Sequence, residues 1–274
     1  MKKCAYCRLA KRLTKEHVIP SWIIREQPDS NVRFDLTQQR VSERVPTIRD
    51  VCSDCNSGAL STLDSYALTL YDRYFSNKVS ERGVVFEYDY DLFARWLLKL
   101  AFNSARKTNS RPDELEPFAD YILGKIPRPV NFRILGFLLR PIIITQAMRR
   151  RLGRDYQGPN SVAPKSISIT RLSKIIPNGL NVLMGRAVLI NSYCFVILTA
   201  PPELARQTRR RWMTELTTEF ATKFRLVYVV DPRFKKMKLM MSDVDLIEMK
   251  RDSLVTFKDE YDDYYRRQHV KRIP

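Results

Sequence analysis

The feature that most constrains this chain is a pair of Cys-x-x-Cys motifs close to its N-terminus. The first motif contains Cys4 and Cys7, and the second contains Cys52 and Cys55. The 274-residue chain has only 5 cysteines and 2 histidines, and one of the histidines, His17, lies between the two motifs. This concentration of ligand-type side chains predicts that they meet at one site.

The four cysteines have the chemistry of a structural metal site. Two Cys-x-x-Cys turns supply four thiolates, the donor set that Zn²⁺ binds in closed tetrahedral sites. Residues 8–51 separate the pairs, so we expect a long excursion that leaves the metal and returns to it. A redox role would not need a second pair, and disulfides are not expected in a chain without an apolar signal segment. The sequence therefore predicts zinc on Cys4, Cys7, Cys52 and Cys55.

Three further polar residues adjoin the cysteine motifs. Glu16 and His17 follow the first pair, and Asn56 follows the second directly. An isolated histidine more often has a capping or core role, but the zinc knuckle is expected to bring Asn56 back towards Glu16 and His17. Carboxylate and amide oxygens suit Mg²⁺ or Mn²⁺, and a neutral imidazole nearby can deprotonate water. These are the parts of a metal-assisted phosphodiester hydrolase.

The combined motifs resemble the HNH (ββα-metal) endonucleases with a four-cysteine zinc knuckle. The resemblance covers about residues 1–70 and extends to the phage endonucleases that resolve Holliday junctions. It is carried by Cys4-x-x-Cys7, Glu16-His17-Val18-Ile19-Pro20 and Cys52-x-x-Cys55-Asn56. It implies that His17 is the general base, that Glu16 and Asn56 hold a catalytic Mg²⁺ or Mn²⁺, and that the cysteine-bound zinc takes no part in the chemistry.

The chain departs from the pattern of this family at two positions, one of which is a Lys that commonly follows the Asn and is missing here. Many members carry an Asn shortly before the second cysteine pair, where it orients the base, and this chain has Thr47 there. Asp50 is the nearest polar substitute, although a turn role is the more common one for such a residue. HNH folds also persist as binding modules. The sequence therefore leaves open a catalytically inactive, zinc-stabilised nucleic-acid-binding protein.

The charge of the chain indicates a polyanionic partner. Lys and Arg total 48 against 30 acidic residues, a formal net charge of +18. Such a charge attracts nucleic acid, with DNA the first expectation, although a merely basic protein would show it too. No segment approaches the ~20 consecutive apolar residues that cross a bilayer, so we expect no membrane partner and a cytoplasmic location. The oligomeric state stays open, a dimer included.

Basic residues gather in three clusters in the C-terminal half. A phosphate-binding face and a merely solvated surface explain these clusters equally well. The clusters are Arg149-Arg150-Arg151, the group Arg206, Arg209, Arg210 and Arg211, and the run from Arg233 to Lys238. The second cluster lies near a predicted helix start, where cations do not complement the helix dipole. This placement favours an anionic partner for Arg209, Arg210 and Arg211.

Hydrophobic periodicity predicts an α+β fold class. We expect helices over residues 57–77, 91–106 (with Asp91 as N-cap) and 113–124, and a strand over 83–88. Strands are expected within 130–139, 162–172, 181–199 and 226–230, with a helix after Pro201-Pro202 and a charged helix in the last 30 residues.

The expected domains are a zinc-bound ββα-metal (HNH) domain over residues 1–78, a helical connecting segment over 79–128 and a basic mixed α/β domain over 129–274. The junction of a small nuclease with a larger, unmatched domain also suggests a gated effector of antiphage defence or a toxin. The sequence thus predicts an endonuclease acting on DNA, with two alternatives left open.

Overall fold

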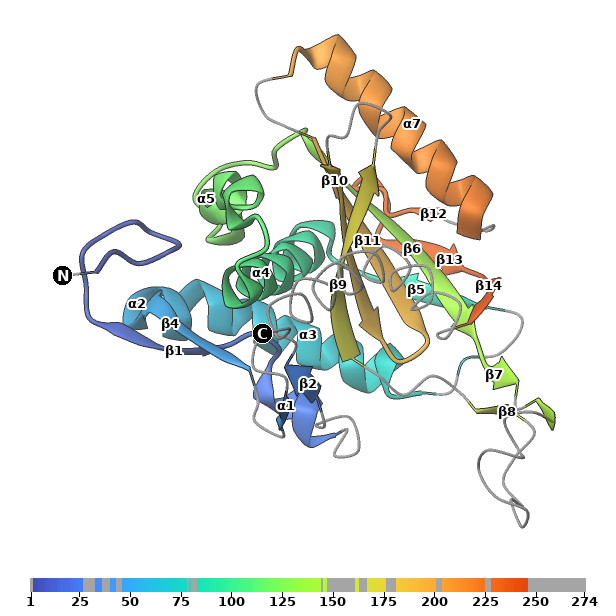
Figure 1. Cartoon of the computed structure of the whole chain (residues 1–274), viewed down its shortest axis with the longest axis horizontal. Helices are drawn as coiled ribbons and strands as arrows, with labels where there is room; N and C mark the ends of the chain where they lie inside the picture. The colour runs from blue at the N-terminus through green and yellow to red at the C-terminus, as the bar shows by residue number, and fades with distance from the viewer. Residues whose placement is uncertain are drawn as a thin grey trace, which may run out of the picture.

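The computed structural model describes residues 2–26, 33–35, 40–42, 46–77, 79, 83–143, 145–146, 161–162, 167–175, 181–200, 204–224 and 228–245. Within them the protein is a mixed α/β structure with a four-cysteine cluster near the N-terminus (Figure 1). The charged helix predicted at the end of the chain and the cluster Arg149-Arg150-Arg151 lie outside the described residues.

A β-hairpin followed by a helical segment forms the N-terminal part. Strand β1 (Leu13–His17) pairs antiparallel with β4 (Thr47–Cys52). The chain then enters α2 (Ser53–Cys55), η2 (Asn56–Leu60), α3 (Ser61–Leu70) and η3 (Tyr71–Phe75), with a kink at Gly58. Helix α1 (Ser21–Arg25) and the paired strands β2 (Arg33–Asp35) and β3 (Arg40–Ser42) belong to the excursion between β1 and β4. The helix predicted over 57–77 is confirmed.

Helix α4 (Tyr90–Thr108) confirms the helix predicted over residues 91–106. Its N-cap is Asp89, whose side chain accepts a hydrogen bond from the Leu92 backbone N–H at 2.9 Å. The prediction of Asp91 as N-cap is wrong, because the chain turns into the helix two residues earlier. Asp91 accepts a hydrogen bond from the Tyr121 hydroxyl instead, at 2.7 Å. Asn109, in the left-handed conformation, ends the helix.

The segment after α4 is less regular than predicted. In place of one helix over 113–124 the structure has η4 (Pro112–Glu114), η5 (Glu116–Phe118) and α5 (Ala119–Ile122). Pro117 lies within this run, and a proline lacks the backbone N–H that a continuous helix needs.

A six-stranded sheet follows. Its strands are β6 (Phe132–Arg140), β9 (Ile167–Ile175), β10 (Asn181–Ile190), β11 (Tyr193–Thr199), β12 (Tyr228–Val229) and β14 (Met241–Asp245). Neighbours in the order β12-β6-β11-β10-β9 are antiparallel, and β14 pairs parallel with β6. A turn at Asn191-Ser192 divides the predicted region 181–199 into β10 and β11. Two smaller pairs are β5 (Val84–Glu87) with β13 (Lys236–Leu239), and β7 (Ile142–Ile143) with β8 (Ser161–Val162).

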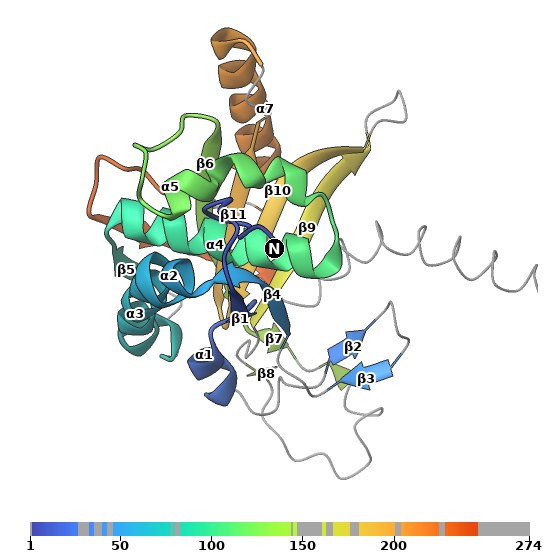
Figure 2. The ribbon, with the colours of Figure 1, turned by 90° about the vertical axis from the view of Figure 1, so that its left-hand side faces the viewer.

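The two faces of the sheet are buried against different helices. Helix α4 lies across one face, and α7 (Arg206–Phe224) lies along the other (Figures 1 and 2). Alternate residues of β11 divide between these layers: Phe195 belongs to the core shared with α4 and the knuckle, whereas Cys194 faces the core of α7. Cys194 is fully buried. Residues 1–78, 79–128 and the described part of 129–274 all contribute to the core on the α4 side.

The described helices include none with the length and apolar character that crossing a bilayer requires.

Candidate functional site

The four predicted zinc ligands meet at one point. The sulfur atoms of Cys4, Cys7, Cys52 and Cys55 all lie within 4.8 Å of one another, and those of Cys7 and Cys52 are 3.7 Å apart. A zinc–sulfur bond of about 2.3 Å places the sulfurs of a regular tetrahedron about 3.8 Å apart. The cluster could therefore hold a metal ion such as zinc with little rearrangement.

Backbone hydrogen bonds shape both Cys-x-x-Cys turns. The Cys4 N–H donates to the Leu9 carbonyl at 2.9 Å, and the Arg8 N–H donates to the Cys4 carbonyl at 2.9 Å. The second pair lies where β4 becomes α2, and the Cys52 N–H donates to the Cys4 sulfur at 3.3 Å. This last hydrogen bond holds the turn of the first cysteine pair against the end of β4, where the second pair begins.

The thiols of the cluster have different proton affinities. Burial alone would raise the pKa of Cys4, but the backbone N–H groups of Cys52, Cys7 and Tyr6 outweigh it and lower the pKa to about 7. Burial and the neighbouring sulfurs raise the pKa of Cys55. Because metal ligation requires thiolates, a bound cation would compensate the charges that this crowding disfavours.

Glu16 faces the interior, where it has a cationic partner. Its side chain is buried, and Oε1 lies 3.0 Å from Nζ of Lys99 on α4. Lys99 is only 1% exposed and also contacts Oδ2 of Asp64 on α3 at 2.6 Å. A buried ammonium thus joins a β1 carboxylate to an α3 carboxylate. Burial raises the pKa of Asp64, although Lys99 opposes that rise.

Asn103, one turn after Lys99, extends this buried polar network. Its Nδ2 donates to Oε1 of Glu16 at 3.1 Å and to the His17 carbonyl at 3.2 Å. Its Oδ1 accepts hydrogen bonds from the Tyr6 hydroxyl at 2.6 Å and from Nη2 of Arg106 at 2.8 Å. One amide therefore connects α4, the first Cys-x-x-Cys turn and the end of β1.

Asp50, weighed above as the residue that orients His17, pairs with a different side chain. Its Oδ2 accepts a hydrogen bond from Nε of Arg106 at 2.9 Å, and its Oδ1 is buried without a partner. The structure therefore gives Asp50 a role in joining β4 to α4.

Within the described residues, Nδ1 of His17 and Oδ1 of Asn56 have no hydrogen-bond partner. Thr47 is directly opposite His17 in the β1–β4 register, and Nδ1 of His17 is buried without a hydrogen-bond partner. Nδ2 of Asn56 donates to Thr14 Oγ1 at 3.1 Å and to the Lys15 carbonyl at 3.0 Å, which places Asn56 against the strand of Glu16 and His17. No hydrogen bond joins Oδ1 of Asn56 to a described residue.

Sequence reasoning missed the polar face of α4. Lys99, Asn103 and Arg106 are spaced four and three residues apart, the helical repeat that aligns side chains on one face. They lie in a helix whose other buried residues are largely apolar. This spacing of polar residues within an apolar helix was the available signal, and it indicates a buried partner for each of them.

The predicted nucleic-acid-binding arginines are found in two settings. Arg209 and Arg210 line a pocket between α7 and β6, whereas Arg211 pairs with Glu215 one turn later, at 2.7 Å. Arg149, Arg150 and Arg151 lie outside the described residues.

Comparisons with protein-family models, curated proteins and solved structures found no match to this chain. The function proposed below therefore depends on the site itself.

Proposed function

We propose that this protein is a metal-dependent endonuclease of the HNH type that hydrolyses phosphodiester bonds in DNA, with His17 as general base. The unpartnered Nδ1 of His17 carries the proposal. A buried polar atom without a hydrogen bond costs free energy, so its retention on the strand that also carries Glu16 supports a chemical role for His17. The net charge of +18 supports a polyanionic substrate.

Each site residue has a distinct task under this proposal. The His17 imidazole accepts a proton from the attacking water, and pairing with β4 together with the Asn103 bond to the His17 carbonyl fixes the strand that carries it. The four cysteines hold zinc and fix the hairpin against the helical segment. The zinc ion has no catalytic task.

The proposed second ion is Mg²⁺ or Mn²⁺, with Glu16 and Asn56 as ligands. When bound, such an ion would stabilise the negative charge that develops on the phosphate. The amide oxygen of Asn56 fits this role, because the bonds of Asn56 Nδ2 orient the amide and no described residue bonds to the oxygen. Glu16 fits less well, because its Oε1 already bonds to Lys99 and Asn103.

We expect His17→Ala to reduce nicking of supercoiled plasmid by about 10²–10⁴-fold in the presence of Mn²⁺ or Mg²⁺, the usual contribution of a general base. The measurement is the rate at which purified wild-type and variant proteins convert supercoiled DNA into nicked circles. Unchanged zinc content and melting temperature in the variant would show that the fold is intact. Wild-type protein that leaves supercoiled, linear and branched DNA uncut with either metal would sink the proposal.

A second candidate is a zinc-stabilised nucleic-acid-binding protein without catalytic activity. The Lys99–Glu16 contact favours it, because an ammonium already neutralises the carboxylate that would hold the catalytic ion. This candidate predicts salt-dependent DNA binding that His17→Ala does not alter, and no cleavage by any variant.

A further inference from the structure

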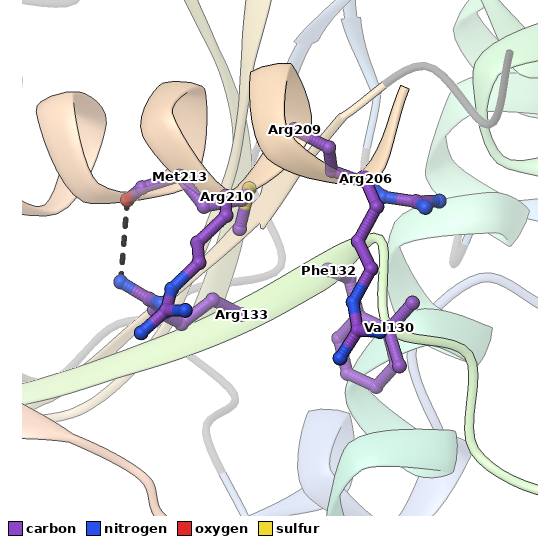
Figure 3. A pocket seen from close by; sticks show the side chains of 7 residues that line it. All are labelled: Val130, Phe132, Arg133, Arg206, Arg209, Arg210 and Met213. Atoms are coloured by element: carbon purple, nitrogen blue, oxygen red, sulfur yellow. Dashed lines mark hydrogen bonds between the residues drawn. The ribbon is translucent and has the colours of Figure 1, made fainter. Parts of the chain in front are cut away.

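A pocket of about 520 Å³ lies between the start of α7 and the start of β6 (Figure 3). Its volume is in the range of small-molecule sites, about 300–1,000 Å³. Among the described residues, four arginines and three apolar side chains line it: Arg133, Arg206, Arg209, Arg210, Val130, Phe132 and Met213. No acidic residue is among them.

The arginines that α7 contributes to this pocket have no charge partner among the residues that the structure describes. Within the described residues, no carboxylate lies within ion-pair distance of Arg206, Arg209 or Arg210. The next arginine along the helix behaves differently, since Arg211 pairs with Glu215 at 2.7 Å. Folding gains nothing from several like charges around one cavity, because they repel one another. Their arrangement therefore indicates an anionic ligand.

The polarity of helix α7 indicates the same ligand charge. Arg206 is the first residue of a 19-residue helix that has no acidic side chain in its first turn. The N-terminal end of a helix carries a partial positive charge, which disfavours arginine and favours an anion. An anion in the pocket would interact favourably with both the helix end and the guanidinium groups.

Arg133 is held in place by α7 rather than by an acid. Its Nη1 donates to Thr217 Oγ1 at 2.8 Å and to the Met213 carbonyl at 3.3 Å. Burial lowers the pKa of Arg133, and a guanidinium stays charged in spite of such a shift. In Figure 3 the side chain of Arg210 extends from α7 towards β6, the strand that carries Arg133. Two helix-positioned guanidinium groups thus face one cavity.

We propose that this pocket binds a nucleoside phosphate, with the phosphate on the arginines and the nucleoside against Val130, Phe132 and Met213. An inorganic anion would use the charges alone and leave the apolar wall and much of the volume unfilled. In Figure 3 Arg206 extends towards Phe132 and Val130, so charge and apolar surface adjoin. The ligand is a free nucleotide or a nucleotide within a nucleic-acid strand. The site is separate from His17 and needs no hydrolysis.

The test is binding of three probes to the full chain at low ionic strength without added divalent ions. The probes are AMP, inorganic phosphate and a fluorescent single-stranded oligodeoxythymidylate, measured by calorimetry and fluorescence anisotropy. We expect the double variant R206Q/R210Q to weaken binding of AMP, of the strand or of both by about tenfold or more, because it removes two charge-assisted contacts. Arg211→Gln, which removes the same charge from the same helix, should change affinity by less than about twofold.

The probes distinguish the two sources of the ligand. Pocket-dependent binding of AMP alone assigns a free nucleotide, and that of the strand alone assigns nucleic acid. The proposal is overturned when neither AMP nor the strand binds. It is also overturned when Arg211→Gln weakens binding as much as R206Q/R210Q, or when inorganic phosphate binds as tightly as AMP. A protein that binds AMP without nicking plasmid would contradict only the nuclease proposal.

Discussion

Cys52→Ser is expected to abolish zinc binding at the cysteine cluster and to unfold the N-terminal hairpin together with its helical segment. Cys52 is the last residue of β4 and directly precedes α2, and its sulfur lies 3.7 Å from that of Cys7. A structural zinc site supplies about 10–16 kcal/mol of binding free energy that is available only to the folded state. A hydroxyl in place of one thiolate forfeits much of it, and without a bound cation the three remaining thiols do not hold the two cysteine turns together.

This prediction is measured as zinc atoms per chain and as the thermal unfolding transition. Cys194→Ala is the matched control, because Cys194 is fully buried in the sheet and is not part of the cluster. It should retain one zinc ion and lose only about 1 kcal/mol of stability. Wild-type protein that purifies without zinc, or a Cys52→Ser protein that retains both zinc and its melting temperature, would refute the metal site.

Lys99→Met is expected to lower the free energy of unfolding by about 3–5 kcal/mol, the usual cost of breaking a buried ion pair. The ammonium lies between Oε1 of Glu16 and Oδ2 of Asp64, at 3.0 and 2.6 Å. Without it, two carboxylates face each other in the interior. Burial already raises the pKa of Asp64. In the folded variant this carboxyl therefore binds a proton more readily than in the unfolded chain, so the loss of stability should shrink as the pH falls through its raised pKa.

Denaturant unfolding of Lys99→Met beside Lys107→Met measures this effect. Lys107 is an exposed residue of the same helix, and its substitution should change stability by less than about 0.5 kcal/mol. Adding Glu16→Gln and Asp64→Asn to Lys99→Met removes the uncompensated charges and should recover part of the loss. Equal stability of the two single variants would show that the buried ammonium contributes nothing.

The local parts of this structure were predictable from sequence. The two Cys-x-x-Cys motifs indicated their own cluster, and the apolar repeat around Trp96 and Leu100 indicated α4. Boundaries were harder to predict: Asp89 and Asp91 are both plausible caps, and the choice depends on where the chain turns. The prediction of one helix over 113–124 was wrong, because it followed the apolar repeat and ignored Pro117, which has no backbone N–H to donate.

The contacts of the candidate site depend on tertiary structure, so sequence could not supply them. Glu16, Asp64 and Lys99 are far apart in the chain and meet only because β1, α3 and α4 pack together. A carboxylate before a histidine predicts a metal ligand, and nothing local to Glu16 indicates an ammonium at that position. The arginine pocket likewise combines Arg133 of β6 with Arg210 of α7, which no linear motif joins.

The central claim, that His17 acts as the base of a nuclease, is tested most directly by chemical rescue. We would measure plasmid nicking by wild type, by His17→Gly, and by His17→Gly with added imidazole, each with Mn²⁺. We predict that the variant is inactive and that imidazole restores nicking, because free imidazole can enter the vacated space and accept the proton. Equal nicking by wild type and variant, or a variant that imidazole does not restore, would contradict the assignment of His17.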